Sequence, residues 1–298
     1  MDSQSAQRSR LDFLSIGHVT RDVHSNGSFS PGGTVTFATV TAYFLGLVAG
    51  IVTRADAELA AILPGLLPPV SLHIGPSAQT TTFANRYHDG FRTQYLYAKA
   101  DDLQSTDIPI DWLDAGVVLF GPLAQELHPE IVLNFPRHPG KILAATPQGW
   151  LRRWDADGRV WPTPWRDAEL ILPALDVLIL SHDDLLPFAN GQRREADALL
   201  KHWSTFVPLL VATDGRHGAT LFQSGRIQHF PAYPVQEIDP TGAGDVFAAA
   251  FLTHLYRHHN PEQAVDFANC TAAFSITQPG IKGIPTLARV EEKLRVRE

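Results

Sequence analysis

The sequence predicts an α/β protein with a mostly parallel central sheet and helices on both of its faces. Apolar segments of strand length alternate with longer segments of helical periodicity along most of the 298 residues. Such alternation is typical of parallel sheets whose connections are helices. Hydrophobic residues make up 44% and charged residues 18% of the chain, which indicates a folded rather than a disordered protein.

The elements follow one another in a regular order. An apolar strand is predicted at 11–16, before Gly17, and a loop rich in Gly, Ser and Pro at 25–33 separates it from a helix over 34–45. Further strands are expected at 47–53, 70–74, 117–120, 141–144, 177–180 and 209–213. Further helices are expected at 126–135, 194–203, 243–257, 261–277 and 286–295.

Residues 23–53 contain no Asp, Glu, Lys or Arg. Their apolar part, 35–53, is long enough to span a bilayer. It also contains four Thr and two Gly, and it lacks a basic flank on its N-terminal side. A buried helix followed by a buried strand explains the segment better, so we expect no membrane association.

One region departs from the alternation and predicts a small accessory sheet. Residues 80–87 and 91–98 are rich in Thr, Tyr and Phe and flank Asp89–Gly90, a pattern typical of a β-hairpin. We expect one domain over 1–298, with a β lid formed from about 20–33 and 80–98. Asp155 to Gly158 predicts a turn between two further strands.

The composition excludes several classes of function. A formal net charge of −7 argues against nucleic-acid binding, which needs a basic surface. The single cysteine, Cys270, excludes an intramolecular disulfide and a cysteine-based zinc cluster. The polar N-terminal residues contain no apolar signal segment, and we expect a cytoplasmic protein.

The segment that carries chemistry is DPTGAGD, at 239–245. Small residues at 242–244 let the backbone approach a ligand, and the free N–H groups and dipole of the following helix favour an anion such as phosphate. Asp245 would repel that anion, so we expect it to accept a proton from an attacking hydroxyl. A Walker A loop is excluded because no Lys follows, and Phe247 replaces the last glycine of a dinucleotide fingerprint. A helix N-terminus in which Asp245 only complements the dipole is the alternative without function.

DPTGAGDVF closely resembles the second signature of the PfkB family of sugar kinases, which have the ribokinase-like fold. Other segments match in the order the family has them. Residues 16–22 resemble its first strand and substrate-binding Asp, and Gly32–Gly33 resembles its first signature. Residues 211–219 are similar to the segment near the nucleotide, and 280–286 to the loop beyond the adenine-side helices. The segments TTTFANRY and PQGWLR are similar to those of a branch that contains myo-inositol kinases.

The resemblance implies a three-layer ribokinase-like sandwich and an ATP-dependent kinase that phosphorylates a hydroxyl of a small sugar or polyol such as myo-inositol. It implies Asp245 as general base, with an anion hole at Gly242, Ala243 and Gly244. The substrate side would comprise Asp22, Gly32, Gly33 and Phe37. The nucleotide would be bordered by Thr213, Gly215, Gly218, Thr241 and Asn269, and Mg²⁺ organised by Asp184 and Asp239.

Two positions depart from the family pattern. Phe37 stands where the family usually has a substrate-binding Asn. The family's N-x-x-E motif for magnesium appears as Ser181 to Asp184, with a shorter carboxylate and no amide. A nucleoside kinase, in which Phe37 stacks on the base, and a non-catalytic ligand-binding protein therefore stay open. So do a requirement for a monovalent cation and a homodimer formed through the lid.

Overall fold

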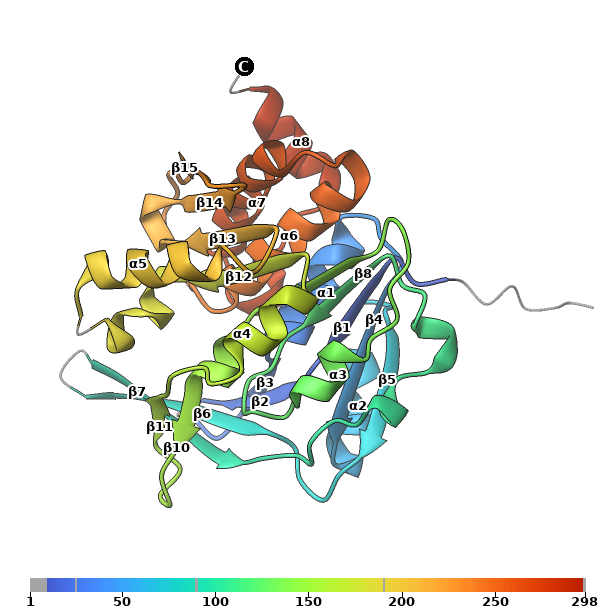
Figure 1. Ribbon diagram of the computed structural model, residues 1–298. Coiled ribbons are helices and arrows are strands. Elements are labelled where there is room, and N and C mark those ends of the chain that lie inside the picture. Colours follow the sequence, from blue (N-terminus) through green and yellow to red (C-terminus); the bar gives the residue numbers. More distant parts are fainter. Residues whose placement is uncertain (1–9, 25, 89–90, 190, 297–298) are drawn as a thin grey trace, which may run out of the picture.

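The computed structural model describes residues 10–24, 26–88, 91–189 and 191–296. Its centre is a nine-stranded sheet with the order β15-β14-β13-β12-β9-β8-β1-β4-β5 (Figure 1). Strands β13 to β5 of this order are parallel, and β14 and β15 extend the sheet antiparallel at one edge. The predicted mostly parallel α/β class is therefore confirmed. The sheet comprises β1 (Phe13–Ile16), β4 (Ala49–Ala55), β5 (Ser71–Pro76), β8 (Val117–Phe120), β9 (Ile142–Ala145), β12 (Val177–Ser181), β13 (Leu209–Thr213), β14 (Ala219–Gln223) and β15 (Arg226–Phe230).

Helices cover both faces of this sheet (Figure 1). Apolar side chains of α1, α2, α6, α7 and α8 pack on one face, and those of α3, α4 and α5 pack on the other. The central strands are buried along their whole length, which is why their sequences are almost continuously apolar. The helices are α1 (Thr34–Phe44), α2 (Ala57–Leu66), α3 (Pro129–Leu133), α4 (Ala168–Ile171), α5 (Arg193–Trp203), α6 (Ala243–His258), α7 (Pro261–Ser275) and α8 (Leu287–Arg295).

Helix α1 and strand β4 account for the segment without charges. Residues Thr34 to Ala42 of α1 are all buried, because the helix lies between the sheet and the helices α2 and α6. A helix surrounded in this way has no polar face. Among the described residues, no helix is long and apolar enough to cross a membrane.

A second, four-stranded sheet lies beside the carboxyl edge of the central sheet (Figure 1). Its order is β3-β2-β6-β7, with β2 (Thr20–Val23), β3 (Phe29–Gly32), β6 (Thr82–His88) and β7 (Phe91–Ala98). These strands fall within 20–33 and 80–98, and we call them the lid sheet. The predicted turn at Asp89–Gly90 lies outside the described residues.

The predicted turn after Asp155 connects two short strands, β10 (Arg152–Trp154) and β11 (Val160–Pro162). This hairpin is attached to the lid sheet by a bridge between Tyr95 and Arg159 and by the Leu96 N–H, which donates to the Gly158 carbonyl at 2.8 Å. A side chain on Gly158 would overlap the carbonyl oxygen of Leu96, and the φ of Gly158, +83°, also favours glycine.

A buried polar cluster joins the lid sheet to the central sheet. The carboxylate of Glu126 is fully buried and accepts hydrogen bonds from the N–H groups of His18, Leu123 and Ala124, at 2.7–3.0 Å. The His18 ring lies between the Thr81 hydroxyl (2.7 Å) and the Asp101 carbonyl (3.1 Å). His18 lies two residues before the lid strand β2, and Thr81 lies directly before β6, so the cluster fixes the points where the chain enters the lid.

Candidate functional site

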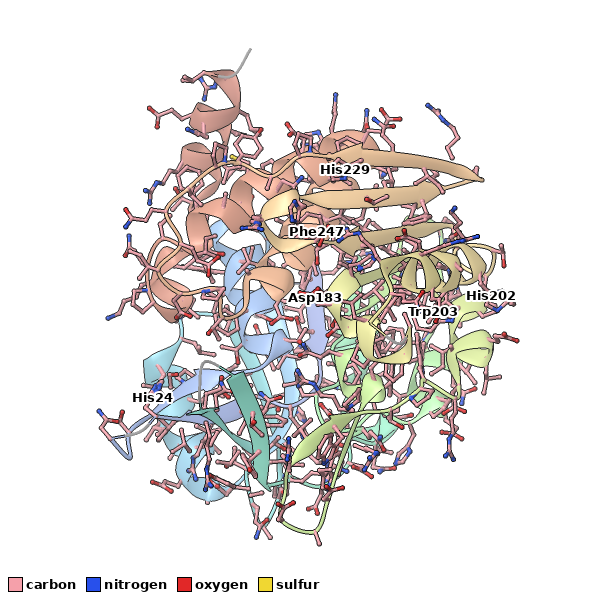
Figure 2. The ribbon with its side chains drawn as sticks, turned by 90° about the vertical axis from the view of Figure 1, so that its left-hand side faces the viewer. His24, Asp183, His202, Trp203, His229 and Phe247 are labelled. Carbon is pink, nitrogen blue, oxygen red and sulfur yellow. The ribbon has the colours of Figure 1, made fainter. Side chains whose placement is uncertain are left out.

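The candidate site lies at the carboxyl edge of the central sheet, facing the lid sheet. Strands β1, β8, β9 and β12 end at this edge, and helices α1 and α6 begin there. In open parallel sheets this edge is the usual place for ligands. Figure 2 shows Phe247 and Asp183 near the middle of the side view, with His24 out on the lid at the lower left.

The predicted anion loop forms a turn that opens helix α6. Gly242 has φ +76°, a left-handed conformation, and no side chain caps the helix there. The Ala243 N–H donates to the Pro240 carbonyl at 3.1 Å, so this predicted member of the anion hole is engaged within the loop. Among the described residues, no backbone acceptor pairs with the N–H groups of Gly242 and Gly244. These two groups therefore remain for an anion at the positive end of the helix dipole.

Phe37 packs against this loop. Its ring occupies the space that a Cβ on Gly242 would need, and the side chain is only 4% exposed. The loop covers most of the ring, so little of it is exposed for contact with a substrate or for stacking on a nucleoside base. The substrate role of Phe37 stays a prediction.

Asp245 occupies the first turn of α6, at the floor of the site. Burial raises the pKa of its carboxyl to about 6, and the charges of Asp184 and Asp22 act in the same direction. Arg152 and the nearby Thr34 hydroxyl oppose this rise. Within the described part of the chain, the Thr34 hydroxyl has no partner in hydrogen-bonding geometry. A carboxyl with a pKa near neutrality is suited to accept and release a proton.

Asp22, Gly32 and Gly33 lie together on the lid side of the site. Asp22 accepts a hydrogen bond from the Thr20 hydroxyl at 2.8 Å, and a side chain on Gly32 would overlap its carboxylate. Gly33 precedes α1 with φ +91°, and a side chain there would meet the His18 carbonyl. Gly32 thus lets the backbone pass close to Asp22, and Gly33 lets it pass close to the His18 carbonyl.

Asp184 lies on the opposite wall, in a short 3₁₀ turn after β12. Burial raises the pKa of its carboxyl, whereas the charge of Arg152, the Ser181 N–H and the Gln148 side chain oppose the rise. The Ser181 hydroxyl accepts from the Asp183 N–H, and Asp184 accepts from the Ser181 N–H, each at 3.2 Å. Ser181 stands at the position of the family's Asn, and here its hydroxyl caps this turn.

Arg152 is the main site residue that sequence reasoning did not assign. Its positive charge lowers the pKa of both Asp184 and Asp245, so it acts on both carboxylates. It also lies over the Phe83 ring at 5.9 Å, on the lid side. In the sequence, Arg152 is marked only by its place in PQGWLR, a segment that resembles one of the myo-inositol kinase branch. An arginine is a typical phosphate-binding group, and this is the signal that could have identified it.

Asp239 and Thr241 organise the anion loop. Asp239 accepts hydrogen bonds from the Thr241 and Gly280 N–H groups, both at 3.0 Å. Burial acts to raise the pKa of Asp239, but these hydrogen bonds outweigh it and leave the pKa below its usual value. With its oxygens used in this way, Asp239 positions the loop. This leaves Asp184 as the carboxylate for a phosphate-bound metal ion.

A cavity of about 370 Å³ adjoins the anion loop on the side away from the lid. Its lining includes four of the residues expected at the nucleotide, namely Thr213, Gly215, Gly218 and Asn269. The Asn269 amide donates to the Phe230 and Pro231 carbonyls at 3.3 Å, so it fixes one wall of the cavity. Gly218, at φ +95°, passes where a side chain would collide with the Phe230 carbonyl.

The donor set for a divalent cation is sparse. Within the described ranges, no cluster of three or more His, Cys, Asp and Glu side chains is arranged to hold a metal ion. A cage built from protein groups alone does not fit this site. Mg²⁺ that arrives on phosphate oxygens and keeps several waters needs only one or two carboxylates, and Asp184 fits that demand.

Comparisons with known proteins agree with this geometry. Residues 156–287 match the model of the pfkB family carbohydrate kinases. Fructokinase-2 of Zea mays is 30% identical over 168 residues, which cover 52% of this chain and 50% of the relative. The chain thus spans about half the length of the curated relatives it matches.

Solved structures match over nearly the whole chain. A pyrophosphate-dependent kinase of the ribokinase family, complexed with a pyrophosphate analog and myo-inositol, has a TM-score of 0.77 at 23% identity and covers 94% of this chain and 99% of its own. Arabidopsis thaliana ribokinase, complexed with ribose and ATP, has a TM-score of 0.74 at 17% identity and covers 96% and 99%. The chain therefore has the ribokinase-like fold, and its residues 156–287 match the pfkB family of carbohydrate kinases.

Proposed function

We propose that the protein is an ATP-dependent kinase that transfers the γ-phosphoryl group to a hydroxyl of a small sugar or polyol. The observation that carries this proposal is Asp245, a carboxyl with a pKa of about 6 at the N-terminus of α6. It lies beside two open N–H groups and shares the electrostatic surroundings of Asp22 and Arg152. A base, an anion site and a substrate-side acid thus meet in one place.

The chain's own residues account for the transfer step. Asp245 accepts the proton of the attacking hydroxyl, while Asp22 accepts hydrogen bonds from other hydroxyls of the acceptor. The N–H groups of Gly242 and Gly244 and the Arg152 guanidinium stabilise charge on the transferring phosphoryl group. Magnesium, when bound, neutralises phosphate charge, and Asp184 would orient its waters. The lid sheet excludes water and so limits hydrolysis of the donor.

The cavity beside the anion loop supports a nucleotide as donor. Its volume of about 370 Å³ and its lining by Tyr233, Phe247 and Ile276 suit a purine ring, with the loop at one end for the phosphates. Pyrophosphate would leave this cavity empty. Myo-inositol remains the specific acceptor that the sequence resemblance suggests. A monovalent cation, a homodimer through the free edge of β3 and a cytoplasmic location are further parts of the proposal.

Two alternatives remain, and one observation weighs against each. A nucleoside kinase depends on Phe37 stacking on a base, and the Phe37 ring, packed against Gly242, is only 4% exposed. A non-catalytic binding protein has no need of a carboxyl with a raised pKa beside the anion loop.

The test is a donor and acceptor screen with the purified chain and Mg²⁺. ATP and pyrophosphate are each combined with myo-inositol, ribose, fructose, 2-keto-3-deoxygluconate, sugar phosphates and nucleosides, and product is detected directly. We expect ATP-dependent phosphorylation of at least one sugar or polyol. Transfer from pyrophosphate alone would overturn the donor, and ATP binding without any transfer would favour the non-catalytic alternative.

A further inference from the structure

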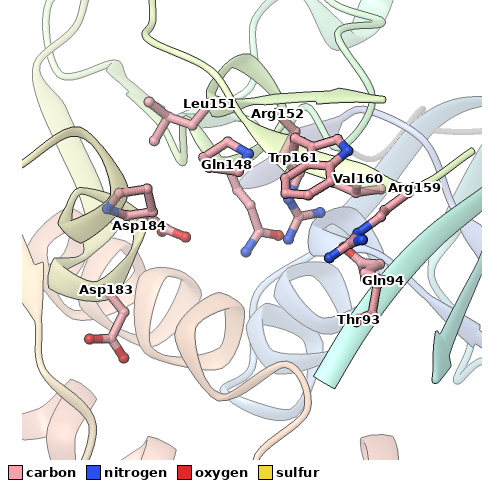
Figure 3. Close-up of a pocket in the computed structure, with 12 residues that line it drawn as sticks. Thr93, Gln94, Gln148, Leu151, Arg152, Arg159, Val160, Trp161, Asp183 and Asp184 are labelled. Carbon is pink, nitrogen blue, oxygen red and sulfur yellow. The ribbon is translucent and has the colours of Figure 1, made fainter. Parts of the chain in front are cut away.

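A second arginine lines a cavity between the lid sheet and the wall that carries Asp184. Arg159, on the β10–β11 hairpin, lines a cavity of about 290 Å³ together with Arg152, Gln148 and the lid residues Thr93 and Gln94. In Figure 3, Arg152 and Arg159 lie on the right of this cavity and Asp183 and Asp184 on the left. The cavity shares no lining residue with the one assigned to the donor, so Arg159 lies away from the nucleotide base.

The two aspartates of this cavity have other partners. The charge of Asp184 is faced by Arg152 and the Gln148 side chain. Asp183 lies near Arg193, whose pKa it helps to raise. In the described part of the chain, no carboxylate forms an ion pair with Arg159. Within the described residues, Arg159 is therefore the cation of this cavity that forms no ion pair with an acid.

The guanidinium of Arg159 is held in place. It stacks over the Trp161 ring, with 4.1 Å between the guanidinium carbon and the ring centroid. The Arg159 backbone carbonyl accepts from the Asp155 N–H at 3.1 Å, and its N–H donates to Asp157 at 3.2 Å. The bridge to Tyr95 ties the same residue to the lid strand β7. A stacked, half-buried guanidinium offers a fixed fork of donors that matches a carboxylate or a phosphate.

We propose that the acceptor is an anionic sugar or polyol, one that carries a carboxylate or a phosphate group bound by Arg159 at the end remote from the phosphorylated hydroxyl. This inference rests on the proposed kinase function. Arg152 is shared between Asp184 and Asp245 and serves the transferring phosphoryl group, which leaves Arg159 for the acceptor. Thr93 and Gln94 supply additional polar groups from the lid. A neutral acceptor would leave the Arg159 charge half-buried and without an anionic partner.

The experiment compares matched acceptors with ATP and Mg²⁺. D-gluconate is paired with D-glucitol, fructose 6-phosphate with fructose, and a myo-inositol monophosphate with myo-inositol. We expect the anionic member of at least one pair to have a kcat/KM about 10- to 100-fold higher, the range for hydrogen bonds to a charged group. The gluconate pair reports a carboxylate acceptor, and the two phosphate pairs report a phosphate ester.

Variants assign the preference to Arg159. Arg159→Gln should raise KM for the anionic acceptor about 10- to 100-fold and leave kcat/KM for its neutral partner within about twofold, and Arg159→Lys should restore part of the loss. Arg153→Gln is the matched control, since Arg153 lies on the same hairpin, is exposed and pairs with Asp155. Equal use of neutral and anionic acceptors, or equal effects of the two Gln variants, would overturn this inference and leave the kinase function standing. No transfer to any acceptor would overturn the kinase function itself.

Discussion

The ring of Phe37 lies against the α carbon of Gly242, in the space that a side chain on residue 242 would require. Phe37 belongs to α1, which follows the lid strand β3, whereas Gly242 opens α6. The contact therefore joins the acceptor-side helix to the anion loop. It also explains why this position is glycine by two separate requirements, a positive φ and the absence of a Cβ.

Gly242→Ala should abolish most activity, because the new methyl group pushes the loop away from the Phe37 ring. Gly225→Ala is a matched control, since Gly225 has nearly the same φ (+77° against +76°) with nothing within 4 Å of a Cβ. Both variants bear the cost of a left-handed alanine, about 1–2 kcal/mol, but only Gly242→Ala should weaken binding of ATP. Urea unfolding and nucleotide titration measure the two effects. Equal losses of ATP affinity in both variants would contradict this explanation.

Asp245→Asn should reduce turnover by roughly 10²–10⁴-fold, the usual scale for loss of a general base. The amide keeps the size of the side chain, so ATP binding should persist. Steady-state kinetics and nucleotide titration on the same preparation separate the two. A variant with near-normal turnover would show that another group takes the proton.

The same substitution should stabilise the fold at neutral pH. Burial raises the pKa of Asp245 from 3.8 to about 6, so the ionised form is favoured in the unfolded chain. Wild-type stability is therefore lost as pH rises from about 4 to 6, and the loss persists above that range. Asp245→Asn removes this cost, and we expect a gain of about 1–3 kcal/mol at pH 7.5 that shrinks toward pH 4. Unfolding curves at several pH values measure this gain. A gain that does not depend on pH would argue against a buried, ionised carboxylate.

The value of kcat should fall below about pH 6, where Asp245 becomes protonated. Asp22→Asn removes a like charge and should move this limb to lower pH, whereas Arg152→Gln removes an opposing charge and should move it to higher pH. Opposite displacements in the two variants identify Asp245 as the titrating group. Shifts in the same direction would point to a different base.

Glu126→Gln should destabilise the protein by about 2–5 kcal/mol. The carboxylate is fully buried and accepts from three N–H groups, and an amide would turn its own N–H₂ toward such donors. Because the cluster fixes the entry to the lid, KM for the acceptor should rise more than kcat falls. Glu130→Gln on the exposed face of α3 serves as control. An unchanged free energy of unfolding would mean that the cluster is not a structural junction.

Much of the fold was predictable because the main strands are buried on both faces. Val117–Phe120 and Leu209–Thr213 were predicted with the bounds that the structure has, since an apolar run between polar turns leaves little choice. Helix α2 was missed because Pro64 and Gly65 suggest a break, although both lie in its last turn. The β14–β15 hairpin was missed because its outer strand is largely exposed and reads as a polar segment.

The site was predictable where one local motif carries the chemistry and less so where it depends on packing. Asp245 and its loop follow from seven consecutive residues at 239–245. The packing of Phe37 against Gly242, and the effect of Arg152 on both Asp184 and Asp245, join segments that are far apart in the sequence. No spacing along the chain encodes such contacts. They follow from the arrangement of the sheet.

The hydrogen bond from Leu96 to Gly158 makes the lid sheet and the β10–β11 hairpin one mechanical unit. Arg152 begins that hairpin, and Arg159 directly precedes its second strand. A rotation of the lid would therefore move both guanidiniums, Arg152 away from the transferring phosphoryl group and Arg159 away from the acceptor. The enzyme would thus assemble its electrostatic field only as it encloses an acceptor, and a donor bound alone would meet an incomplete field.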